Sequence, residues 1–232
     1  PYVESIESYL REFGNRFSVV ILSRVNVAAS HIDDVRSYCP NAQVIFDTVD
    51  LHFLREQREA KIAEDTALME KANKRKEQEL GIARKSDVTV VVSPVELDLL
   101  KQEDAAIDVA LLSNIHINYE TSYNFDQRKD ILFIGGFEHP PNGDAMEYFI
   151  AKIFPLIIAQ RPEICIYILG SHPPEELLAR ESKNIIVTGF VSDIEPYFSR
   201  IKLSVAPLRF GAGVKGKINS SMSFGVPVVA TT

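Results

Sequence analysis

Cysteine is scarce in this chain of 232 residues, and its two copies, Cys39 and Cys165, show no spacing typical of a metal site. The pattern predicts free thiols in a reducing, cytoplasmic compartment rather than a disulfide framework or a zinc centre. The sequence also lacks a run of 18 apolar residues and a signal-peptide pattern, so no membrane span is predicted.

Acidic residues are absent from one stretch of an otherwise acidic chain. The net charge is −7, and residues 1–121 hold 21 acidic and 14 basic residues, while residues 122–232 hold 11 of each. An acidic first half argues against nucleic acid as a partner, because binding a phosphate backbone needs a broad basic face. From residue 196 to residue 232 there is no Asp or Glu but there are five basic residues, which favours a small anion as ligand.

Three of these basic residues, Arg209, Lys215 and Lys217, flank a loop that contains Gly211 and Gly213. Glycine lets a backbone approach a ligand closely, and a helix predicted directly behind the loop would point its N-terminus at the same place. This arrangement predicts phosphate binding. The alternative is an ordinary strand–loop–helix turn with solvated lysines.

Apolar segments of strand length alternate with helical segments along the whole chain, which predicts an α/β protein with parallel sheets. The predicted strands are 18–23, 43–47, 87–92, 109–112, 130–134, 164–169, 184–188, 202–206 and 226–232. The predicted helices are 1–17, 30–38, 53–85, 94–102, 142–161, 174–180, 193–200 and 219–225. A polar segment without apolar period separates two halves, so we expect domains at 1–117 and 130–232 joined by a linker at 118–129.

Two of the helices have specific signals. Residues 53–85 are charged and lack Pro, which predicts one long and bent solvated helix; a coiled coil is the alternative, but the interrupted apolar stripe covers too few heptads. Ser93, Pro94 and Glu96 have the spacing of a capped helix start.

The glycine loop and the segment after it resemble a known family. Residues 211–217 read Gly-Ala-Gly-Val-Lys-Gly-Lys and residues 225–231 read Gly-Val-Pro-Val-Val-Ala-Thr. Both are similar to the donor-binding segment of GT-B glycosyltransferases of the family 4 (group 1) type. The resemblance implies two Rossmann-like domains, with the second binding a nucleotide-sugar. It implies that the donor diphosphate is bound by Gly135, Gly136, Arg209, Gly211, Gly213, Val214, Lys215 and Lys217.

Polar residues gathered just past the strand at 43–47 mark a second candidate site, because open α/β sheets bind ligands at the carboxyl ends of their strands. The resemblance implies that a His or Asp in this loop faces the donor sugar, and Asp50 and His52 are therefore the catalytic candidates. The alternative is that these residues cap the next helix and bond locally.

The sequence departs from the family pattern in two places. Ala212 and Ser220 occupy positions where many relatives carry glutamates near the sugar and the ribose. Glu138 and His139 stand in a loop where many relatives carry Arg or Lys, which shifts phosphate binding towards the basic residues of the later loop.

The expected function is that of a retaining glycosyltransferase that needs no metal ion and no cofactor. Its partners would be a nucleotide-sugar and a glycan, lipid or protein acceptor. A degenerate GT-B module that binds a ligand or partner is the alternative, and a phosphorylase or epimerase of the same fold is a weaker one. Because the resemblance begins and ends part-way through a domain, both domains are expected to be incomplete.

Overall fold

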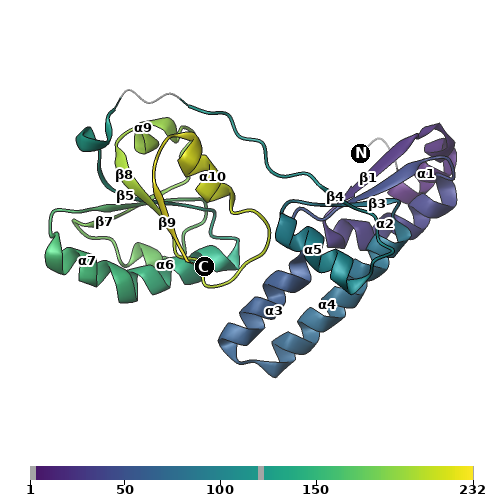
Figure 1. The fold of residues 1–232 in the computed structure, drawn as a ribbon, viewed down its shortest axis with the longest axis horizontal. Helices are drawn as coiled ribbons and strands as arrows, with labels where there is room; N and C mark the ends of the chain where they lie inside the picture. Colours follow the sequence, from purple (N-terminus) through teal and green to yellow (C-terminus); the bar gives the residue numbers. More distant parts are fainter. Residues whose placement is uncertain (1–3, 120–122, 232) are drawn as a thin grey trace. The chain divides into compact units, whose positions relative to one another are not determined.

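A computed structural model describes residues 4–119 and 123–231, and it divides the chain into two compact units (Figure 1). Unit 1 comprises Pro1–Asn114 together with Gly211–Val214, and unit 2 comprises Ile115–Phe210 and Lys215–Thr232. The predicted linker at 118–129 falls in the first part of unit 2. Residues 1–3 of the first predicted helix and 120–122 of the predicted linker lie outside the described residues.

Unit 1 is built on a parallel sheet of four strands in the order β1-β2-β3-β4. The strands are β1 (Val19–Ser23), β2 (Gln43–Asp47), β3 (Val88–Val91) and β4 (Val109–Leu111). Val44 and Phe46 point from β2 into the core and are at most 1% exposed, as expected for a central strand with helices packed against it.

Apart from the stretch at 53–85, the helices of unit 1 follow the predicted order with shifted ends. They are α1 (Ile6–Phe13), a 3₁₀ turn (Gly14–Arg16), α2 (Val25–Tyr38), α3 (His52–Ala63), α4 (Thr66–Lys85) and α5 (Pro94–Glu103). The prediction placed the start of α2 at Ser30, five residues late. The helix starts at Val25 because Val25 and Ala28 are completely buried and continue its apolar face towards β1. The start of α5 is confirmed: Ser93 Oγ accepts a hydrogen bond of 3.2 Å from the N–H of Glu96.

The prediction of one long helix at 53–85 is wrong, since α3 and α4 form an antiparallel hairpin (Figure 1). Glu64 ends α3 in the left-handed conformation with φ 52°, and Asp65 starts α4 by accepting hydrogen bonds from the N–H groups of Ala67 and Leu68. The turn contains neither Gly nor Pro. The one feature of the sequence that indicates this turn is Asp65, a residue type favoured at helix N-caps.

Unit 2 contains a parallel sheet of five strands in the order β7-β6-β5-β8-β9. The strands are β5 (Lys129–Ile134), β6 (Ile166–Leu169), β7 (Ile185–Gly189), β8 (Ile201–Ala206) and β9 (Val228–Ala230). The strand order reverses between β5 and β8. An open parallel sheet forms a crevice at the carboxyl ends of two such strands, and crevices of this kind bind ligands.

The helices of unit 2 are α6 (Pro140–Tyr148), α7 (Phe154–Gln160), α8 (Glu175–Leu178), α9 (Glu195–Phe198) and α10 (Gly216–Ser223), with a 3₁₀ turn at Phe125–Gln127. Between α6 and α7 the backbone runs through a π-helical segment, Phe149–Ile153. The predicted helix at 142–161 is therefore interrupted just before Pro155, which has no N–H to continue an α-helical ladder. The two-sheet α/β architecture itself is confirmed.

Candidate functional site

In unit 1, the turn after β2 is fixed from both neighbouring strands. Asp47 accepts a hydrogen bond of 2.9 Å from Ser23 Oγ, and buried Thr48 donates its hydroxyl to the Val90 carbonyl at 2.9 Å. Val49 then adopts a φ of 64°. A β-branched residue in this left-handed region carries backbone strain, so the surrounding hydrogen bonds must hold the turn in place.

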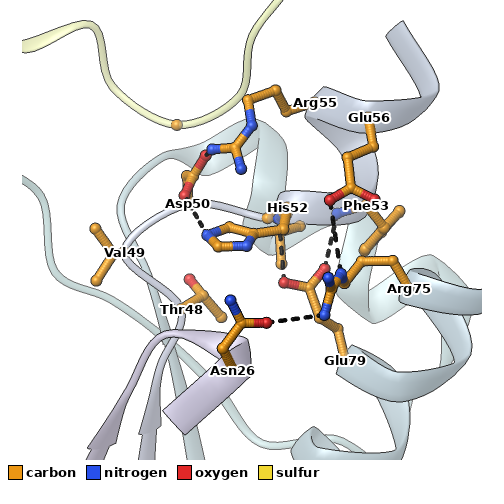
Figure 2. A network of polar contacts seen from close by, with 12 residues as sticks. Asn26, Thr48, Val49, Asp50, His52, Phe53, Arg55, Glu56, Arg75 and Glu79 are labelled. Atoms are coloured by element: carbon orange, nitrogen blue, oxygen red, sulfur yellow. Dashed lines mark hydrogen bonds and ion pairs between the residues drawn. The ribbon is translucent and has the colours of Figure 1, made fainter. Parts of the chain in front are cut away.

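The turn leads to the two catalytic candidates, which the structure brings together (Figure 2). His52 Nε2 lies 3.2 Å from Asp50 Oδ1, and Arg55 Nη1 lies 2.5 Å from Asp50 Oδ2. The side chains of His52 and Asp50 are only 13% and 17% exposed. Asp50 thus orients the imidazole and is itself held by a guanidinium, an arrangement that suits a histidine close to reacting atoms.

The alternative, that these residues cap the next helix and bond locally, holds in part: Asp50 contacts His52 and Arg55 close by in the chain, but neither Asp50 nor His52 caps α3. The N-cap of α3 is Leu51, which has no side-chain oxygen, and the first N–H groups of the helix instead reach carboxylates from other helices. Leu51 N–H donates to Glu96 Oε1 at 3.1 Å, while His52 and Phe53 donate to the two oxygens of Glu79 at 3.1 and 2.9 Å. Both glutamates are 1% exposed.

Sequence reasoning missed Glu79 and Glu96 as functional candidates. Burial raises the pKa of the Glu79 carboxyl to about 7, against the opposing effect of the N–H bonds from Phe53 and His52. One signal existed: Glu79 follows Ala72 by seven residues and precedes Leu80 on the buried side of α4, where a carboxylate needs partners.

In unit 2, Gly135 and Gly136 directly follow β5, at the carboxyl end of that strand. The Nδ2 group of buried Asn142 donates to the Gly136 carbonyl at 2.7 Å and would lie 2.7 Å from a Cβ on Gly135. Gly135 is therefore required by the packing of Asn142. Gly136 is less constrained, because an added Cβ would first meet Ser171 Oγ at 3.1 Å.

The side chain of Lys217, in the first turn of α10, reaches the same Asn142. Its Nζ hydrogen-bonds to Asn142 Oδ1 and lies 4.8 Å from the centre of the Phe133 ring. Burial, followed by the nearby charge of Lys215, lowers the pKa of Lys217 to about 8. Among the described residues Lys217 forms no ion pair, so its positive charge is offset only by an amide dipole and a ring face.

Arg209 is paired with a side chain of its own unit. Its guanidinium forms a two-pronged ion pair with Asp144 on α6, with Nε 2.9 Å from Oδ2, and it lies 5.4 Å from the centre of the Tyr148 ring. Asp144 thus competes with a phosphate for the Arg209 guanidinium, which was predicted to bind the phosphate. The pairing could not be read from the sequence, because the two residues are 65 positions apart.

The remaining predicted ligands divide between the units. Lys215 is the N-cap of α10, and among residues 4–119 and 123–231 no side chain makes a capping hydrogen bond at that helix start. Gly211, Gly213 and Val214 group with unit 1, and the φ values of 149° at Gly211 and 68° at Gly213 are ones that glycine tolerates. Ser220 lies within α10, where its carbonyl accepts a hydrogen bond from Ser223 Oγ.

A hollow of about 670 Å³ lies at the opposite end of the unit 2 sheet, where Lys129 and Ile201 begin β5 and β8. Tyr167, Tyr197 and Arg200 also line it. It contains none of the predicted site residues.

Residues 128–232 match the family of group 1 glycosyltransferases. This match confirms the resemblance seen in the glycine loop. No curated protein sequence matches the chain.

Solved glycosyltransferases share the fold over nearly the whole chain. Sucrose-phosphate synthase from Thermosynechococcus elongatus has a TM-score of 0.75 at 18% identity, with 99% of this chain and 59% of that chain covered. TarM has a TM-score of 0.74 at 16% identity, covering 97% and 43%. HepE of Anabaena, solved with UDP and glucose, has a TM-score of 0.67 at 13% identity, covering 97% and 62%. The GT-B fold is thus established, and the chain spans about half the length of these structures.

No group of three or more His, Cys, Asp or Glu side chains in residues 4–119 and 123–231 could hold a metal ion. Within the same ranges, no helix combines the length and the apolar character needed to cross a bilayer.

Proposed function

We propose that the chain is part of a retaining, metal-independent glycosyltransferase that moves a sugar from a nucleotide-sugar to a glycan, lipid or protein acceptor. The observation that carries the proposal is the half-buried Lys217 ammonium, which hydrogen-bonds to Asn142, the residue that in turn donates to the Gly136 carbonyl after β5. A partly desolvated cation without a carboxylate partner attracts an anion more strongly than a fully solvated one, because less water screens it. The group 1 match makes a sugar diphosphate the fitting anion.

The proposed chemistry is electrostatic. As the bond between sugar and diphosphate breaks, negative charge develops on the leaving oxygen. Lys217 and the N-terminus of α10 would stabilise this charge without a metal ion. In unit 1, His52 and Asp50 are proposed to face the donor sugar, with Asp50 orienting the imidazole. The two free cysteines remain the reason to propose a reducing, cytoplasmic compartment.

Calorimetric titration with UDP, GDP and ADP in the absence of metal tests this assignment. HepE was solved with UDP, so UDP is the first nucleotide to try. Binding of one nucleotide should be saturable and should weaken at least about tenfold in Lys217→Ala, the loss of one charge-assisted contact. Lys183→Ala, which removes an exposed lysine of the same unit, is the matched control and should bind as the native chain does. Equal affinity in the native chain and in Lys217→Ala would refute the site.

A module that binds without transferring sugar is the second candidate. Ala212 and Ser220 lack the carboxylates of many relatives, and Asp144 engages Arg209. Such a module would bind the nucleotide and lose it in Lys217→Ala, but would release no free nucleotide from a nucleotide-sugar in the presence of candidate acceptors. Release of nucleotide that depends on the acceptor and disappears in His52→Ala would exclude it.

A further inference from the structure

The N-terminus of α3 is held by acids that come from elsewhere in the fold. A helix start normally uses the side chain of its own N-cap residue, but Leu51 cannot accept a hydrogen bond with its side chain. Glu79 takes its place for His52 and Phe53, and Glu96 for Leu51 itself. His52, a catalytic candidate, therefore donates its own backbone N–H to a carboxylate of α4.

Both oxygens of Glu79 are in use. Oε1 accepts from His52 and Oε2 from Phe53, which is the pattern of an ionised carboxylate. When the carboxyl is protonated, one oxygen becomes a hydroxyl, and its bond to an N–H group is weakened or lost. Because burial raises the pKa of Glu79 to about 7, both forms are populated near neutral pH.

Charged groups surround this carboxyl on several sides (Figure 2). The turn before α3 supplies Asp50, and α3 supplies His52 and Glu56. Arg75, one turn earlier on α4, lies 3.6 Å from Glu56 and donates to Asn26 of α2 at 3.0 Å. From α5, Glu96 binds the same short stretch of backbone as Glu79. Asp50 favours the protonated form of Glu79 and His52 favours the ionised form, so the charge of Glu79 is coupled to the catalytic pair.

We propose that Glu79 is a positioning residue for His52: its ionised carboxylate fixes the first turn of α3 and so aims the imidazole, and its protonation loosens that turn. The role of the imidazole rests on the proposed function. The link between Glu79 and His52 can be measured without any sugar transfer.

Backbone amide shifts measure that link directly. In ¹⁵N-labelled native chain, the amide proton shifts of His52 and Phe53 should follow a common inflection close to the Glu79 pKa of about 7. The inflection should vanish in Glu79→Gln and persist in Glu77→Gln, which changes an exposed glutamate of the same helix. Amides of His52 and Phe53 that show no shared inflection in the native chain would overturn the proposal, whether or not the variant folds.

Kinetics on the full chain test the positioning itself. In Glu79→Gln, kcat should fall by about 10- to 100-fold, as expected for a misplaced catalytic group, while KM for the donor changes little. The acidic limb near pH 7 should disappear from its pH profile, and Glu77→Gln should keep it. A native kcat in folded Glu79→Gln would overturn the proposal. If the native chain transfers no sugar, the proposed function fails, and the amide titration alone decides whether Glu79 controls the His52 turn.

Discussion

Glu79 on α4 accepts a hydrogen bond of 2.9 Å from the backbone N–H of Phe53, 26 residues earlier in the chain. The bond joins the second helix of a hairpin to the first turn of the helix before it. Its partner bond from His52 makes the contact two-pronged. One buried carboxylate therefore links stability, protonation and the geometry of the candidate active site in unit 1.

Stability should depend on pH through this group. The folded-state pKa of Glu79, about 7, lies above its ordinary value of 4.5, so the folded chain binds more protons than the unfolded chain between these values. The free energy of unfolding should therefore fall as pH rises from 4.5 to 7, by at most about 3 kcal/mol from this residue. Urea denaturation at several pH values should show a flatter dependence in Glu79→Gln than in Glu77→Gln. Parallel curves for both variants would contradict the expectation.

Nucleotide affinity should fall at alkaline pH. The pKa of Lys217 is lowered to about 8, so the ammonium that attracts the diphosphate is lost as pH rises through that value. The dissociation constant for UDP, measured by calorimetry, should rise between about pH 7 and pH 9, and should be less pH-dependent in Lys217→Met. An affinity of the native chain that is constant over this range would show that the charge of Lys217 does not contribute to binding.

Gly135 should tolerate no side chain, although it lies in a loop. In Gly135→Ala the new Cβ would meet Asn142 Nδ2 at 2.7 Å, and overpacking of this kind costs about 1–3 kcal/mol. Gly143→Ala is the matched control: nothing lies within 4 Å of its new Cβ, and helix propensity favours Ala by up to about 1 kcal/mol. Thermal unfolding should move the two variants in opposite directions. A second change, Asn142→Ala, should restore part of the stability lost in Gly135→Ala.

The hairpin turn should depend on Asp65. Its carboxylate accepts the N–H groups of Ala67 and Leu68, so Asp65→Ala should destabilise unit 1 by about 1 kcal/mol. Glu64→Gly should act in the opposite sense, because it relieves a left-handed φ of 52°. Circular dichroism during urea denaturation can measure both shifts. Equal stability of Asp65→Ala and the native chain would mean that the cap is dispensable.

The sequence alone could predict the elements whose signals are local. Alternating strands and helices indicated parallel sheets, and Ser93 with Pro94 marked the start of α5 correctly. The family match at residues 128–232 was visible in the glycine loop, because a loop that needs particular φ values restricts its residues strongly.

Tertiary partners could not be predicted in the same way. The helix break at Glu64 uses neither Gly nor Pro, so the charged stretch looked continuous. Asp144 pairs with Arg209 across 65 positions, and Glu79 caps a helix that begins 27 residues before it. Each depends on which helix faces the sheet brings together. The position of Glu79 beside Leu80 on α4 indicates a carboxylate that needs partners, but it does not identify them.

The external cap on α3 also bears on how unit 1 opens and folds. A helix of 12 residues is marginal in water, and without an N-cap side chain of its own α3 has little reason to persist when α4 is undocked. Its amide protons should then exchange with solvent in the same cooperative opening as those around Glu79. The turn that carries His52 would thus be a late-forming part of the unit, assembled only once the hairpin has closed.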